Sequence, residues 1–132
     1  MEIRKEYEKY LRENRYNFEV DDYGGDMYYC IFQGNIFCFV ALELIDEKVV
    51  TAQYYIRMTK DSYDDLYYLE TEWDKYELKD IIEYTEQLID RGKELNSAIN
   101  KIRVKLEQIK EIMEQNDLEF EEFITLNFNF DE

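Results

Sequence analysis

Carboxylates are the residues of this sequence whose number and spacing could do chemistry, and they are most concentrated in residues 61–80. This stretch, DSYDDLYYLETEWDKYELKD, holds eight acidic residues, two lysines and five aromatic residues. Grouped carboxylates can act as an acid–base pair, bind a cation, or attract a basic surface of another protein. The residue types therefore allow three kinds of chemistry, which the rest of the sequence helps to separate.

The composition argues against the first kind, catalysis. The 132 residues include no histidine, which removes the commonest general base and every Ser–His–Asp or Cys–His arrangement. No glycine-rich phosphate-binding loop is present. Carboxylate pairs alone would allow a two-acid hydrolase, but nothing in the sequence marks one pair as buried. We therefore predict that the protein is not an enzyme.

Metal and cofactor binding are not expected either. Cys30 and Cys38 are too few for a structural zinc site, and no histidine can complete one. The segment DDYGGD (21–26) lacks the ligand spacing of an EF-hand, so we interpret it as a turn. Neither cysteine has a basic neighbour in the sequence, which favours two buried apolar side chains. The sequence thus predicts no metal and no cofactor.

The third kind of chemistry, binding to a basic protein surface, is the one we expect. If residues 66–74 form a strand, carboxylates two residues apart point the same way at about 6.6 Å, which is similar to the spacing of phosphates along a nucleic-acid strand. Acids of the following helix would extend this row. The residues expected to contact the partner are Asp64, Asp65, Glu70, Glu72, Asp74, Glu77, Asp80, Tyr67, Tyr68 and Trp73. The alternative interpretation is an ordinary solvated face of a sheet and a helix.

The net charge of −16 points to the same class of partner. Nucleic acid is itself densely negative, so we expect no direct DNA binding and an attraction to basic proteins. Residues 61–90 hold eleven acids and two bases, and residues 111–132 hold eight acids and no base. Residues 91–110, with six bases and two acids, separate them. This basic block could hold an acidic strip of a second copy, touch guide RNA, or pair within the chain.

Acidic, rich in tyrosine and free of histidine along its whole length, the chain resembles phage and plasmid anti-defence proteins, which include anti-CRISPR and anti-restriction inhibitors. The similarity lies in composition and charge pattern, and no family motif is matched residue by residue. Many proteins of this group occupy the nucleic-acid cleft of a target enzyme as DNA mimics. The resemblance implies a non-enzymatic inhibitor of a defence nuclease. The basic block is a departure, since a pure DNA mimic would not need it.

A second function is compatible with the same sequence. Acidic α+β domains of this size also resemble secretion chaperones, which hold an extended client along a sheet and dimerise through helices. An apolar groove on the sheet would favour a peptide-binding chaperone or adaptor, whereas a ridge lined by acids would favour the DNA mimic. In either case we expect a cytoplasmic protein, because the first twenty residues are highly charged and no apolar run could span a bilayer.

An α+β fold in a single domain, 1–132, would position these residues. A 3.6-residue period predicts an N-terminal helix over 2–14. Runs of β-formers and alternation predict an antiparallel β-meander of four or five strands, over 16–20, 27–33, 36–44, 49–58 and 66–73. A hairpin turn is expected at QGN (33–35), and the alternating tail, 120–130, is predicted to be a closing strand.

A long helix is expected between the meander and the tail. The segment DKYE (74–77) fits a capping box, so a helix should begin there. Apolar residues then follow a heptad spacing over 78–113, with Thr85 and Gly92 as exceptions. Uninterrupted, such a helix would be roughly 60 Å long. It therefore either ends near Gly92 and folds back as a hairpin, or continues and pairs with a partner, for example as a homodimer through 78–113.

Overall fold

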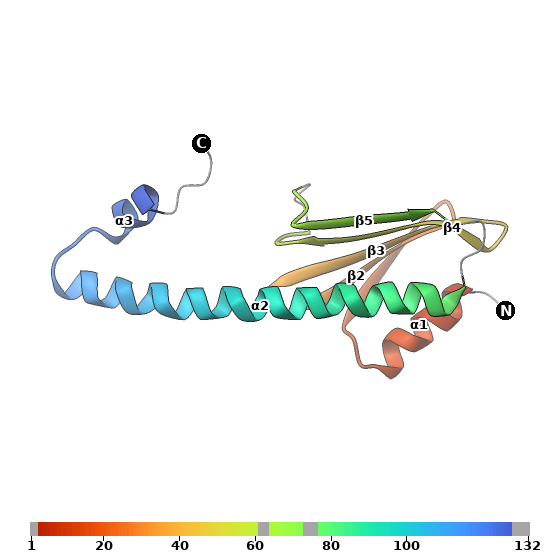
Figure 1. Ribbon diagram of the computed structural model, residues 1–132, viewed down its shortest axis with the longest axis horizontal. Helices are drawn as coiled ribbons and strands as arrows, with labels where there is room; N and C mark the ends of the chain where they lie inside the picture. The colour runs from red at the N-terminus through yellow and green to blue at the C-terminus, as the bar shows by residue number, and fades with distance from the viewer. Residues whose placement is uncertain (1–2, 61–63, 73–76, 128–132) are drawn as a thin grey trace. The chain divides into compact units, whose positions relative to one another are not determined.

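The structure is a computed structural model that describes residues 3–60, 64–72 and 77–127, and it contains an antiparallel sheet and helices (Figure 1). The elements are α1 (Ile3–Glu13), β1 (Phe18–Tyr23), β2 (Asp26–Gln33), β3 (Ile36–Ile45), β4 (Lys48–Arg57), β5 (Tyr67–Glu72), α2 (Leu78–Gln115) and α3 (Phe120–Asn127). The strand order is β1-β2-β3-β4-β5, so each strand pairs with its neighbour in the sequence. The predicted α+β class, N-terminal helix and meander are confirmed.

The chain divides into two compact units, residues 1–96 and 97–132. The first unit contains α1, the sheet and the first half of α2. The second unit contains the rest of α2 and α3. Helix α2 itself runs without a break from Leu78 to Gln115, so the continuous helix is the correct one of the two predicted possibilities.

A tight turn sets the register of β2 and β3. Gln33 pairs with Ile36, which leaves a two-residue loop in which Gly34 has a φ of 61°. With this loop, Cys30 lies opposite Phe39 on β3, one residue out of step with Cys38. Side chains alternate along a strand, so the two cysteines point to opposite faces of the sheet. Turn chemistry in the sequence thus decides which strand residues share a face.

The face of the sheet that carries Cys38 is covered by α1 and the first half of α2, and we call it the covered face (Figure 1). Its buried strand residues include Met27, Tyr29, Ile31, Val40, Leu42, Ala52, Tyr54 and Ile56. The helices contribute Tyr7, Leu11, Ile81, Leu88 and Ile89. The Tyr7 ring lies 4.9 Å from that of Tyr29, and its hydroxyl shares a 2.8 Å hydrogen bond with Thr85. A single core therefore joins both helices to the sheet.

The two exceptions in the heptad pattern are explained by this packing. Thr85 is fully buried and bonds to Tyr7, so a hydroxyl is useful where the heptad would place an aliphatic side chain. At Gly92, an added Cβ would lie 2.7 Å from the Sγ atom of Cys38. Glycine therefore lets the helix backbone approach the sheet at this point, and Gly92 serves close packing rather than a helix end.

The start of α2 and the end of β1 are among the boundaries that differ from the predictions. Helix α2 begins at Leu78 rather than at the predicted capping box, whose Asp74 lies outside the described residues. The Glu77 N–H donates to the Asp80 carboxylate at 3.2 Å. Asp80 therefore accepts the capping hydrogen bond that the sequence pattern assigned to the side chain of Glu77. Strand β1 also continues to Tyr23, which shortens the predicted 21–26 turn to its two glycines.

The predicted closing strand is wrong, because the described part of the tail forms α3. Phe120, Phe123 and Ile124 share one face of a helix, and the two phenyl rings lie 6.3 Å apart. Thr125 donates a hydrogen bond to the Glu121 carbonyl, one turn earlier. A helix satisfies its backbone groups locally, whereas a strand needs a neighbouring edge. The apolar alternation of the tail could not reveal whether such an edge was within reach.

Candidate partner-binding site

The face of the sheet opposite the covered face is not packed against α1 or α2, and we call it the open face. The strand register brings together one row across all five strands: Glu19, Cys30, Phe39, Tyr55 and Tyr68. The next row consists of Asp21, Tyr28, Ala41, Gln53 and Glu70. Both rows combine aromatic residues with acids at the edge strands.

Aromatic rings form an apolar strip on the open face. The rings of Phe39 and Tyr55 stack at 4.9 Å with an interplanar angle of 10°, and Tyr68 lies 6.4 Å from Tyr55. Tyr23 and Tyr28 meet edge to face at 5.3 Å. Tyr23 is 65% exposed and Tyr68 is 50% exposed. Rings that are held by neighbours but open to solvent are suitable anchors for another protein.

Two cations on the open face are engaged within the chain. The guanidinium of Arg57 lies 4.5 Å from the centre of the Tyr55 ring and pairs with Asp65 at 2.6 Å. Lys60 pairs with Glu19, and the hydrogen bond to this carboxylate raises the pKa of Lys60. Each of these two cations therefore neutralises one carboxylate.

Four exposed carboxylates on the open face form no ion pair with any described residue: Asp21, Glu43, Glu70 and Glu72. Glu70 accepts hydrogen bonds of 3.3 Å from the Tyr68 hydroxyl and from the amide of Gln53. Desolvation and the neighbouring Glu70 charge raise the pKa of Tyr68, so its hydroxyl remains a donor. The face thus presents oriented negative groups beside half-exposed rings.

Two shallow hollows, both lined by Tyr28, shape the open face. The larger has a volume of about 330 Å³ and is lined by Glu19, Asp21, Tyr23, Tyr28, Cys30, Phe39 and Lys60. The smaller, of about 90 Å³, lies toward Glu43 and Gln53. Burial raises the pKa of Cys30 to about 11, so the thiol stays protonated near neutral pH and is a poor nucleophile. The hollows therefore suit side chains of a partner better than covalent chemistry.

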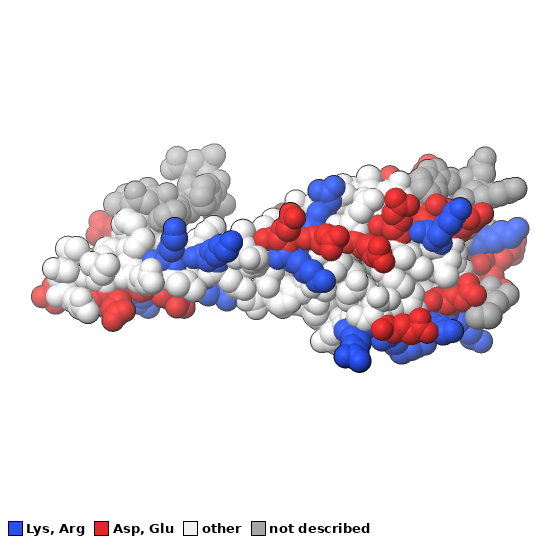
Figure 2. Space-filling model, turned by 60° about the horizontal axis from the view of Figure 1, so that its bottom comes forward, with Lys and Arg blue, Asp and Glu red and all other residues white. Residues whose placement is uncertain are grey.

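A second row of acids lies on the outer side of α2. Glu83, Glu86, Asp90 and Glu94 are exposed, and their spacing places them along one side of the helix. Figure 2 shows this row on the helical side of residues 1–96. Because α2 packs on the covered face, these acids lie on the opposite side of the sheet from Glu70 and Glu72. The single acidic row expected from the sequence is therefore divided between two surfaces.

The structure separates the ten residues predicted to bind a partner. Tyr68, Glu70 and Glu72 lie together on the open face. Tyr67 points to the covered face, where the guanidinium of Arg91 lies 4.7 Å from its ring centre. The alternation of β5 places these neighbours on opposite faces, and only the position of α2 decides which face remains open.

The other predicted residues lie before and after β5. Asp64 and Asp65 lie in the segment before β5, where Asp65 is paired with Arg57. Glu77 and Asp80 lie at the start of α2, and Glu77 pairs with Lys79 at 3.2 Å. Trp73 and Asp74 lie outside the described residues. The predicted set thus contributes three neighbouring residues to the open face.

Sequence reasoning missed the part of this face that comes from the first three strands. Asp21 and Tyr28 face each other across β1 and β2, and Glu43 follows on β3. Their signal was the two-residue period in strands already predicted, combined with the register that the two-residue loop imposes. These residues lie outside 61–80, where the acids are most concentrated, so the prediction from the sequence did not include them.

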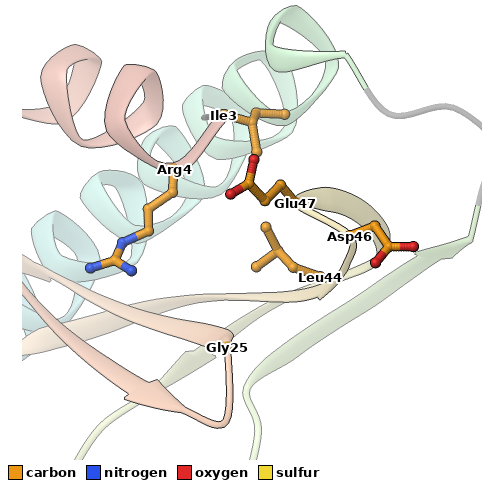
Figure 3. Close-up of a pocket in the computed structure, with 6 residues that line it drawn as sticks. All are labelled: Ile3, Arg4, Gly25, Leu44, Asp46 and Glu47. Atoms are coloured by element: carbon orange, nitrogen blue, oxygen red, sulfur yellow. The ribbon is translucent and has the colours of Figure 1, made fainter. Parts of the chain in front are cut away.

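A separate cavity of about 270 Å³ does not have the features of a catalytic site. Figure 3 shows six described residues that line it, which come from α1, the β1–β2 turn, and the end of β3 with the turn that follows. Arg4, the one cation among these six residues, already pairs with Glu8 and Asp22, both at 3.5 Å. Within the described ranges, no cluster of His, Cys, Asp and Glu could hold a metal ion. Nor does any helix described there have the length and apolar character to cross a membrane.

Comparison of the chain with protein families, with characterised proteins and with solved structures found no match. The function therefore has to be inferred from the chemistry of the open face.

Proposed function

We propose that the protein is a non-enzymatic inhibitor that binds a basic nucleic-acid-binding cleft of a defence nuclease through its open face. The observation that carries the proposal is the group of four carboxylates without a cation partner beside half-exposed tyrosines. Lysine and arginine side chains that normally hold phosphates would meet Asp21, Glu43, Glu70 and Glu72. Tyr28 and Tyr68 would supply the apolar anchors.

The carboxylates and the rings of the open face would contribute to binding in different ways. Carboxylates at the rim of an interface mainly accelerate encounter and select the partner, while buried rings slow dissociation. A basic cleft offers both counter-charges and the aliphatic stems of lysine and arginine, which pack against aromatic rings. The mixed composition of the open face is therefore suited to a partner that ordinarily binds a polyanion.

The proposal is tested by reversing charge where it should matter. The full-length protein is immobilised, nucleic-acid-binding enzymes are captured from a nuclease-containing bacterial lysate, and duplex DNA is added as a competitor. The captured nuclease is then assayed with and without the protein. We expect duplex DNA to displace the enzyme and the protein to inhibit it. Replacing Glu70→Lys and Glu72→Lys together should weaken binding by about 100-fold, since two attractive contacts become repulsive.

A matched control reverses the same number of charges elsewhere. Glu111→Lys with Glu114→Lys changes the net charge equally, at exposed positions of the second unit. This variant should retain binding and inhibition, and circular dichroism should show that both variants are folded. If both variants lost binding equally, the effect would come from net charge and not from the open face. Capture of an enzyme that duplex DNA does not displace would contradict the proposal.

A second candidate, a peptide-binding chaperone or adaptor, is favoured by the apolar part of the same face. The half-exposed rings and the two hollows at Tyr28 could receive apolar side chains of a client. The two candidates differ in their response to salt. Binding to a basic cleft should weaken strongly as salt screens the charges, whereas binding of an apolar extended client should change little. Titrations at low and high ionic strength with the captured partner distinguish them.

A further inference from the structure

We propose that residues 97–115 form a second docking surface, which binds an acidic amphipathic helix of a partner protein as a short coiled coil. The surface is centred on five apolar residues of α2 that we call the exposed seam: Ile99, Ile102, Leu106, Ile109 and Met113. It lies wholly within the second unit and is independent of the open face and its proposed function.

The exposed seam continues the heptad spacing of α2 but lacks the burial of the first half. Among the residues of α2, those that are buried end at Gly92. Ile102 is 56% exposed, and the other four residues of the exposed seam are only half-buried. Aliphatic residues at every a and d position over about four helical turns are the pattern of a coiled-coil interface. A helix with such a stripe needs a partner to bury it.

The charges beside the exposed seam indicate what that partner is. The e and g positions that flank it hold Ala98, Arg103, Lys105, Lys110 and Ile112, so every charged residue among them is basic. The three cations are exposed, and none forms an ion pair with a described residue, although Lys110 Nζ lies 5.7 Å from the centre of the Phe120 ring of α3. Figure 2 shows basic side chains beside uncharged surface along this part of α2. The acids of this segment, such as Glu107 and Glu111, lie at positions away from the interface.

These flanking cations disfavour pairing of two copies. In a parallel dimer, a g residue meets the e residue five positions later in the other helix, so Lys105 would face Lys110. In an antiparallel dimer, g faces g and e faces e, so Lys105 would face Lys105. Like charges at these positions oppose association, whereas Glu or Asp on the other helix would form favourable pairs. An acidic helix is therefore preferred over a second copy, and the homodimer suggested by the sequence is disfavoured.

The short length of the surface sets the expected strength of binding. Five seam residues span about 21 Å along the helix axis. A two-helix contact of this length is weak in isolation, so the affinity should depend visibly on the flanking charges. Overall net charge opposes an acidic partner, but at physiological salt this repulsion is screened beyond about 8 Å. Contacts at the flanks should therefore dominate the choice of partner.

The test uses the full-length chain and two synthetic helical peptides of about three heptads. Both peptides carry leucine at a and d; one carries glutamate at e and g, and the other carries lysine. Fluorescence anisotropy at physiological salt measures their binding, and analytical ultracentrifugation of the chain alone measures self-association. We expect the glutamate peptide to bind at least about tenfold more tightly than the lysine peptide, and the chain alone to remain monomeric.

Charge reversal makes the test specific. Arg103→Glu with Lys105→Glu should reverse the preference, so that the lysine peptide binds more tightly. The matched control, Lys93→Glu with Lys101→Glu, makes the same change in net charge at exposed positions outside e and g and should keep the original preference. Equal binding of the two peptides, a preference unchanged by reversal at 103 and 105, or a stable dimer of the chain alone would overturn the proposal.

Discussion

The two halves of α2 carry the same heptad spacing but have different surroundings. In the first half, Ile81 and Leu88 are fully buried against the sheet, and the pattern is interrupted by Thr85 and Gly92. In the second half the pattern is regular and aliphatic, yet Ile102 is 56% exposed. The irregular half is adapted to a sheet, which requires a hydroxyl and a close approach, whereas the regular half has the pattern that we propose to bind another helix.

The same contrast extends to charge. The first unit presents carboxylates beside aromatic rings on the open face, and the second presents cations beside aliphatic residues on α2. A single net charge of −16 conceals this difference. The chain is therefore better described by two surfaces of opposite charge than by its overall acidity.

The largest expected difference between the halves of α2 is the effect of removing a seam side chain. Leu88→Ala should lower the free energy of unfolding by about 2–5 kcal/mol, because it leaves a cavity in the core. Ile102→Ala, at an exposed position of the same pattern, should change it by less than about 0.5 kcal/mol. Urea unfolding followed by circular dichroism measures both. Similar losses would mean that the second half of α2 is buried in the native chain.

A smaller effect tests why glycine interrupts the pattern. Gly92→Ala should destabilise the fold by about 1–3 kcal/mol through the contact with Cys38, partly offset by the higher helix propensity of alanine. Adding Cys38→Ala removes the Sγ atom that the new Cβ at position 92 would contact. In a double-mutant cycle, the two changes together should therefore cost at least about 1 kcal/mol less than their sum. Strict additivity would show that the close approach does not constrain position 92.

Alkaline pH should affect the two units differently, because every cysteine and tyrosine lies in the first unit. Burial raises the pKa of Cys38 from 9.0 to about 12 and raises the pKa values of Tyr7 and Tyr29 above their usual 10.0. The unfolded chain then loses these protons at lower pH than the native chain. The free energy of unfolding should be constant below about pH 9 and fall above it. The slope is about 1.4 kcal/mol per pH unit for each group that is ionised in the unfolded chain but still protonated in the native chain.

The tyrosine signal in near-ultraviolet circular dichroism follows this loss in the first unit. Urea midpoints are measured from neutral pH to pH 11. Tyr7→Phe removes one of the groups concerned and should flatten the slope, although it also removes the hydrogen bond to Thr85 and lowers stability at every pH. A midpoint that stays constant up to pH 11 would contradict the assignment of these groups as buried and neutral.

The sequence by itself determined the local structure of this protein. The 3.6-residue period of α1, the alternation along the strands, the hairpin turn at 33–35 and the heptads of α2 each follow from interactions between residues close in the sequence. The alternation of Tyr67 with Tyr68 and Glu70 was also apparent. The tail was predicted incorrectly, since its apolar residues fit both a helix and a strand, and the choice depended on whether an edge was within reach.

Only the tertiary structure decided which surfaces are free. A strand period states that Glu70 and Tyr67 point in opposite directions, but not which direction is covered. That choice was made by contacts between distant residues, such as Gly92 with Cys38 and Thr85 with Tyr7, which place α2 on one face. The same placement separated the acids of α2 from those of β5 and covered the apolar residues of α2 only as far as the sheet contacts extend. Periodicity reports which residues share a face, whereas burial depends on what packs against that face.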